Sequence, residues 1–109
     1  MPYDEGLAER LREIFASRKN VTERKMFGGI AFMVSGNMCC GVVNDVLMAR
    51  VGADQHDAAL KIPHARKMDF TGKPMKGFVY VAPEGFESDS DLAYWIGLCT
   101  DFVATLPAK

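Results

Sequence analysis

The side chains of this 109-residue chain that are best suited to catalysis or metal binding belong to three cysteines and two histidines: Cys39, Cys40, Cys99, His56 and His64. A thiolate is a nucleophile and a soft metal ligand when a nearby cation or helix terminus lowers its pKa. Cys39 and Cys40, however, are neighbours in a predicted strand, where adjacent side chains point to opposite faces. We therefore expect the two thiols to diverge and, with Cys99, to behave as small buried apolar residues.

The histidines do not complete a metal or catalytic site. A zinc site takes three or four His, Cys or carboxylate ligands at suitable spacing, whereas His56 and His64 stand alone on either side of Pro63. No serine or cysteine is placed by the sequence to serve His64 as a nucleophile. Gly28-Gly29 is not followed by the Lys-Ser/Thr pair of a phosphate-binding loop. We expect no catalytic residues, no metal site and no cofactor.

Charge is segregated along the second half of the chain. A basic segment runs from Lys61 to Lys76 and contains a single acid, Asp69. Its five basic residues, which are candidate contacts for a partner or for phosphate, are Lys61, Arg66, Lys67, Lys73 and Lys76. The acids that follow are Glu84, Glu87, Asp89, Asp91 and Asp101. We expect the basic segment to pair with the acidic last helix of the same subunit or of a partner subunit.

Periodicity predicts the elements that position these residues. Apolar residues recur at helical spacing over residues 4–18 and again after Ser88, whose Ser88-x-x-Asp91 pattern resembles a capping box. Between these helices, short apolar runs separated by Gly, Asn and Asp predict strands. The expected order is a helix, a three-stranded antiparallel meander (30–34, 38–43 and 46–51), a helix over 54–60 capped by Asp54, two strands (65–70 and 75–81) and a final helix. This is an α+β fold.

The meander is apolar on both faces. Ile30, Phe32 and Val34 alternate with Ala31 and Met33, so neither set of side chains is suited to water. Two arrangements satisfy this pattern: helices on both sides of the sheet, or helices on one side and a second subunit on the other. The second arrangement predicts a homodimer.

Composition is that of an ordinary globular domain. Hydrophobic residues make up 49% and charged residues 25% of the chain, and the formal net charge is −1. With no linker or internal repeat, we expect one domain over residues 1–109. The absence of an export signal and of a long apolar stretch predicts a cytoplasmic protein without a membrane span.

Several ordered motifs resemble one bacterial family. The runs are MFGGIAFM (26–33), GNMCCGV (36–42) and PHARKMDFTGKPMKGFVYV (63–81), followed by the acidic start and the tryptophan of the last helix. Together they look like the N-terminal domain of the TfoX/Sxy family, and the resemblance covers nearly the whole chain. The similarity implies an α+β fold like that of type III secretion chaperones, which are commonly dimers.

The resemblance also implies a role. The best-known members of the family promote natural competence together with a cyclic-AMP-responsive transcription factor, and they carry a second, C-terminal domain with helix-hairpin-helix character. No region of this sequence resembles that second domain, so we expect a stand-alone N-terminal domain. The family offers no catalytic residues to carry over.

Two functional hypotheses follow. The first is a non-enzymatic protein-interaction or regulatory module that is homodimeric and has a protein partner related to transcription. The alternative is a nucleic-acid-associated accessory protein that uses the basic 61–76 segment on phosphates. The net charge of −1 makes direct nucleic-acid binding the less favoured of the two.

Overall fold

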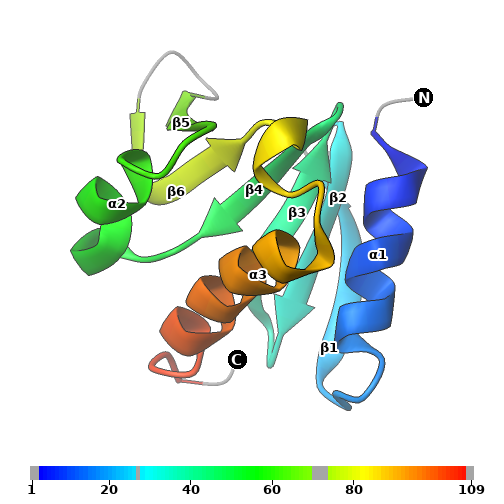
Figure 1. Ribbon diagram of the computed structural model, residues 1–109. Coiled ribbons are helices and arrows are strands. Elements are labelled where there is room, and N and C mark those ends of the chain that lie inside the picture. Colours follow the sequence, from blue (N-terminus) through cyan, green and yellow to red (C-terminus); the bar gives the residue numbers. More distant parts are fainter. Residues whose placement is uncertain (1–2, 27, 70–73, 108–109) are drawn as a thin grey trace.

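The computed structural model describes residues 3–26, 28–69 and 74–107, and within them it has three α-helices and one six-stranded antiparallel sheet (Figure 1). The elements are α1 (Glu5–Phe15), β1 (Val21–Met26), β2 (Gly29–Val34), β3 (Asn37–Val43), β4 (Val46–Arg50), α2 (Ala53–Leu60), β5 (Ala65–Asp69), β6 (Pro74–Val81), the short 3-10 helix η1 (Pro83–Gly85) and α3 (Asp89–Val103). The strand order is β1-β2-β3-β4-β6-β5. The α+β class is confirmed.

Strand β1 is an addition to the expected three-stranded meander. Its sequence, Val-Thr-Glu-Arg-Lys-Met, lacks the apolar run that marks the other strands, because it is an edge strand paired only with β2. Arg12 of α1 holds Glu23 of β1 through a two-pronged ion pair with nitrogen–oxygen distances of 2.9–3.2 Å. The polar strand is thereby fixed to both its neighbours in the fold.

Gly29 makes a close approach to the backbone of the neighbouring strand. Gly29 opens β2 opposite Met26, and a Cβ atom at position 29 would lie 2.0 Å from the carbonyl oxygen of Val42. Any larger residue would push β2 and β3 apart at this point.

Helix α1 packs against the sheet through its predicted apolar stripe. Asp4 caps it by accepting hydrogen bonds from the backbone N–H groups of Gly6 and Leu7. Leu7, Leu11 and Phe15 are buried, and the Phe15 ring stacks on Phe32 of β2 at 5.6 Å between centroids. Ile14, which the stripe also included, is instead 36% exposed, because it lies at the margin of the buried face.

The N-cap of helix α3 is the predicted residue, whereas that of helix α2 is not. Ser88 caps α3, its hydroxyl accepting a 3.1 Å hydrogen bond from the Asp91 N–H, as predicted. The N-cap of helix α2 is Gly52, two residues before the expected Asp54, so Asp54 lies in the first turn rather than at the cap. An acid in that position still interacts favourably with the helix dipole.

All three helices lie on the same side of the sheet (Figure 1). The strand residues that face the helices are paired across the sheet, from Phe32 through Cys40 and Ala49 to Val79. Together with the helices they form the core. The other side, here called the helix-free face, carries Ala31, Gly41, Met48, Tyr80 and Arg66 as cross-strand neighbours. Of the two arrangements open from the sequence, the described residues therefore have helices on one side only.

Candidate functional site

The cysteines are free and buried, but their arrangement differs from the expected one. Phe32 pairs with Cys40 while Met33 pairs with Met38, so a β-bulge leaves Cys39 without a partner on β2. Both adjacent cysteines consequently belong to the core cluster, where Cys39 shares hydrogen bonds with Cys40 and with Cys99 of α3. The prediction that the two thiols diverge was wrong, because strict alternation fails at a bulge.

The three thiols influence one another electrostatically. Hydrogen bonds from Cys40 and Cys99 lower the pKa of Cys39. The same hydrogen bonds, together with burial, raise the pKa of Cys40 and of Cys99. All three side chains have no exposed surface, so they form part of the packing between β3 and α3 rather than a reactive site.

The histidines lie apart. His56 is buried on the inner face of α2, and its Nε2 has no hydrogen-bond partner. His64 is exposed and adopts a positive φ of 73° just before β5. Within the described part of the chain, no group of three or more His, Cys, Asp or Glu residues is arranged to hold a metal ion.

The basic segment is not one continuous patch among the described side chains. Lys61 is the C-cap of α2, on the helix side of the sheet. Arg66 of β5 lies on the helix-free face, its guanidinium 5.6 Å from the centre of the Tyr80 ring. Lys67 and Lys76 belong to β5 and β6, but only their backbones are described, and Lys73 lies outside the described residues.

One acid of the last helix, Asp89, pairs with the first helix instead. Arg10 of α1 forms a 3.3 Å ion pair with Asp89 and donates to the backbone carbonyl oxygen of Glu87. Among the described residues, no ion pair joins Lys61 or Arg66 to an acid of α3. The expected pairing within one subunit is therefore not seen for these two residues.

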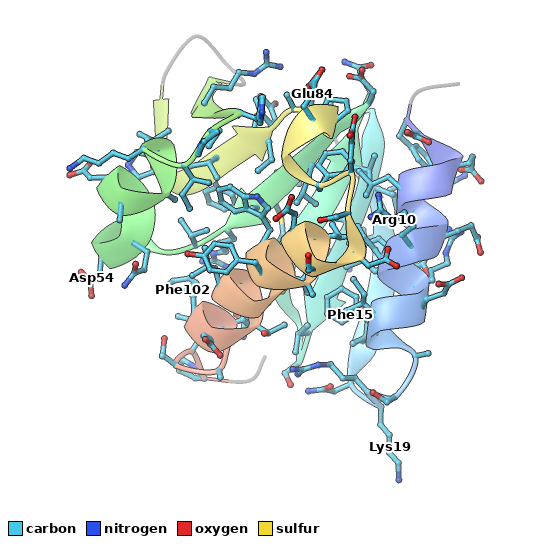
Figure 2. All side chains as sticks on the ribbon, viewed as in Figure 1. Arg10, Phe15, Lys19, Asp54, Glu84 and Phe102 are labelled. Carbon is cyan, nitrogen blue, oxygen red and sulfur yellow. The ribbon has the colours of Figure 1, made fainter. Side chains whose placement is uncertain are left out.

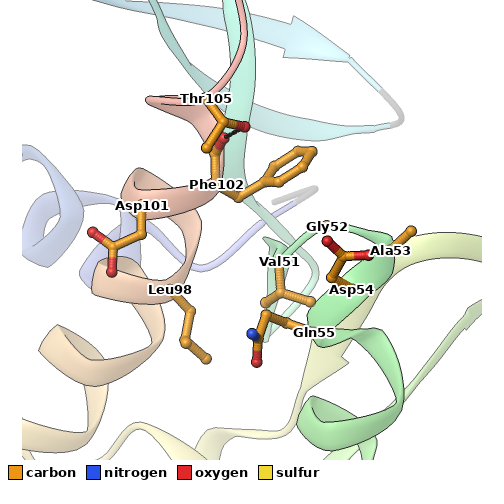
Figure 3. Close-up of a pocket in the computed structure, with 9 residues that line it drawn as sticks. All are labelled: Val51, Gly52, Ala53, Asp54, Gln55, Leu98, Asp101, Phe102 and Thr105. Carbon is orange, nitrogen blue, oxygen red and sulfur yellow. Dashed lines mark hydrogen bonds between the residues drawn. The ribbon is translucent and has the colours of Figure 1, made fainter.

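A cavity lies between the start of α2 and the end of α3 (Figure 3). Its volume is about 540 Å³. Val51, Leu98 and Phe102 give it apolar walls, with Leu98 of α3 facing Gln55 of α2 across the gap. Asp54 on α2 and Asp101 on α3 add one carboxylate from each helix. The cavity thus combines apolar surface with negative charge.

Local backbone geometry builds this cavity. Gly52 has a φ of 89°, which lets the chain turn from β4 into α2 directly beside the ring of Phe102. Arg50 then fixes that ring, because its guanidinium lies 5.3 Å from the centre of Phe102 and 5.5 Å from that of Phe78. Arg50 also donates a 3.2 Å hydrogen bond to the Met38 carbonyl oxygen. Phe102, one of the apolar residues at helical spacing on the last helix, is half-buried and forms a wall of the cavity (Figure 2).

A second cavity lies further towards the start of α3. Its volume is about 300 Å³, and it is bordered by the segment Ile62 to His64, by Glu84 and Gly85, and by the α3 residues Asp91, Tyr94 and Trp95. Tyr94 is 55% exposed. The residues that α3 and the turn after it contribute to the two cavities share one face, since they recur at intervals of three and four residues: Asp91, Tyr94, Trp95, Leu98, Asp101, Phe102 and, in the turn, Thr105. We call these two cavities and their walls the α3 groove.

The α3 groove was not predicted from the sequence. Its signal is the second set of residues at helical spacing on the last helix, from Asp91 through Leu98 to Thr105, beside the core stripe. Mixed apolar and acidic residues at that spacing are also typical of an ordinary solvated helix face. Only the position of α2 turns this face into the wall of a groove.

Comparison with known proteins gives one match. The family model described as TfoX N-terminal domain matches residues 13–103, a range that contains every strand, α2 and α3. No curated protein and no solved structure matches the chain. The described part of the chain has no helix long and apolar enough to cross a membrane.

Proposed function

The chain belongs to the TfoX N-terminal domain family, and on this basis we propose that it is a non-enzymatic protein-interaction module with a regulatory role. The observation that carries the proposal is the extent of the family match, which covers residues 13–103 and so includes both walls of the α3 groove. By analogy with the competence regulators of the family, the partner would be a protein connected with transcription.

The open groove supports a binding role. It leaves Tyr94 exposed and Leu98 and Phe102 half-buried, although an isolated soluble domain gains stability by covering such side chains. Exposed apolar surface rimmed by polar residues is typical of protein interaction sites. The proposed activity is therefore recognition of another chain.

We also propose a homodimer that works in the cytoplasm. On the helix-free face Ala31 and Met48 are already buried, whereas Met33 is half-buried with no helix over it, and a second copy would cover it. The three free thiols suit a reducing compartment.

The test is identification of the partner by reciprocal capture. The full chain, tagged and expressed at its native level in its own organism, is cross-linked in cells and purified, and enriched proteins are identified against a tag-only control. Support requires that one enriched protein captures the chain in return, and that the two purified proteins bind in calorimetry. If no protein passes all three steps, the interaction proposal fails.

The alternative, nucleic-acid association, is favoured by one observation. Arg66 lies over the ring of Tyr80 on the helix-free face, and Arg24 is exposed at the opposite edge of the same face. Exposed cations beside an aromatic ring are features of surfaces that bind single strands.

A further inference from the structure

We propose that the α3 groove docks a basic, amphipathic segment of the partner protein. This inference rests on the proposed function and adds to it the surface and the chemistry of the partner. Three properties of the groove support the inference: its shape, its charge and its apolar walls.

The shape fits a segment of chain rather than a small molecule. The two cavities lie in line along one face of α3, from Asp91 to Thr105. At 1.5 Å per residue, this stretch is roughly 20 Å long, about the length of a four-turn helix. A single small cation would occupy one cavity and leave the other open, whereas a peptide segment spans both.

The charge of the groove is of one sign. Four carboxylates line it, contributed by α2, η1 and α3: Asp54, Glu84, Asp91 and Asp101. All four are exposed, and the described residues that line the two cavities include no lysine or arginine. Complementary potentials steer and orient a partner, so the segment that fits here carries lysine or arginine. The same charge repels a nucleic-acid backbone.

The apolar walls require a second property of the partner. Val51, Leu98 and Phe102 form the walls at one end, and Tyr94 with Ile62 lies at the other. Aromatic residues in such a position supply much of the binding energy of an interface. Charge alone would leave these side chains facing water, so the segment also presents apolar residues, spaced as on one face of a helix.

The probe is a synthetic 14-residue helical peptide of alternating leucine and lysine faces, titrated into the full chain labelled with ¹⁵N. We expect saturable binding, with amide shifts at Gln55 and Leu98 of the first cavity and at Tyr94 of the second. A second peptide keeps every lysine but replaces leucine by serine. It should bind at least about tenfold more weakly, because it cannot cover the apolar walls.

Matched variants locate the site. D54N/D101N removes two groove carboxylates and should weaken binding about tenfold, since each rim charge contributes up to about 1 kcal/mol. D45N/E13Q removes the same charge from exposed positions outside the groove and should leave affinity within about twofold. Both double variants keep the side-chain size, and circular dichroism checks that they remain folded.

Three outcomes of the peptide titrations would overturn the inference. These are equal weakening by both double variants, equal binding of the serine peptide, and shifts that map to the helix-free face. If light scattering of the protein alone shows self-association that D54N/D101N abolishes, the occupant is a second copy and the inference of a partner segment is wrong. If a partner captured in cells binds D54N/D101N as tightly as it binds the wild type, this inference is refuted and the proposed function is left intact.

Discussion

Gly52 packs directly against the ring of Phe102, so that a Cβ atom at position 52 would lie 2.4 Å from Cδ1 of that ring. Gly52 also has a φ of 89° and a ψ of 159°, a conformation that L-residues rarely adopt. The junction between β4 and α2 therefore depends on glycine for two separate reasons, and the adjoining wall of the α3 groove depends on the same junction.

Gly52→Ala should destabilise the protein by about 2–4 kcal/mol, because it combines backbone strain with displacement of the Phe102 ring. The measurement is the free energy of unfolding in urea. Gly97→Ala is the matched control: it lies inside α3, and its added Cβ meets nothing within 4 Å. Alanine there should stabilise the helix by about 0.5–1 kcal/mol. Equal effects of the two substitutions would contradict this account of Gly52.

The sequence was sufficient for elements whose pattern is local. The α3 core stripe and the Ser88 cap were predictable, because a helix and its first turn are specified by residues close together in the chain. Strand β1 was missed because its pairing with β2 and the Arg12–Glu23 ion pair hold a polar sequence that has little strand pattern of its own.

Features that depend on tertiary context were not predictable. The bulge at Cys39 is defined only by the pairing of β3 with β2, and it turns two thiols expected to diverge into one cluster with Cys99. The groove likewise depends on α2 lying beside α3. Phe102 has the spacing of a core residue, yet it ends half-buried because Arg50 and Gly52 hold its ring at the cavity wall.

The thiol cluster predicts a loss of stability at alkaline pH. The folded-state pKa of Cys40 and of Cys99 is raised by the hydrogen bond to Cys39 and by burial. A raised pKa means that the folded state favours the protonated thiol. The resulting stability is fully present below the unfolded pKa of about 8.5 and is lost as pH rises above it, by about 1.4 kcal/mol per pH unit for each thiol.

Urea unfolding at several pH values between 7 and 10 tests this prediction. Cys99→Ala should be less stable than the wild type at pH 7 because it leaves a cavity between β3 and α3. Its stability should nevertheless decline less steeply above pH 8.5 because it has one raised thiol fewer. Lysine and tyrosine titrate in both proteins and cancel in the comparison. Parallel pH profiles would show that Cys99 does not contribute.

The proposed homodimer predicts a mass near twice the 12.0 kDa monomer in size-exclusion chromatography with light scattering. Met33→Lys should shift the equilibrium towards the monomer, because in a two-fold interface on the helix-free face the new charge is buried twice. Ile14→Lys is the control, since Ile14 is an apolar residue 36% exposed on α1, on the other side of the sheet. If the wild type is a monomer at high micromolar concentration, the proposal of a homodimer is wrong.

The last prediction concerns the basic 61–76 segment and separates the two proposed functions. If its five basic residues bound phosphates, the logarithm of affinity would fall with the logarithm of salt concentration at a slope of about −4. We expect no micromolar binding at physiological salt, for two reasons. Lys61 and Arg66 lie on different sides of the sheet, and the chain carries a net charge of −1 with exposed acids along α3.

Fluorescence anisotropy with labelled single- and double-stranded DNA, scanned from low to physiological salt, measures this directly. Lys61→Glu/Arg66→Glu reverses two described members of the segment. Arg18→Glu/Lys19→Glu makes the same charge change at exposed positions after α1. At low salt, where weak non-specific attraction persists, the two double variants should reduce binding equally, because only the overall charge matters there. Micromolar binding that persists at physiological salt and is lost only in the 61/66 variant would instead establish the segment as a phosphate-binding surface, and the nucleic-acid function would replace the interaction module.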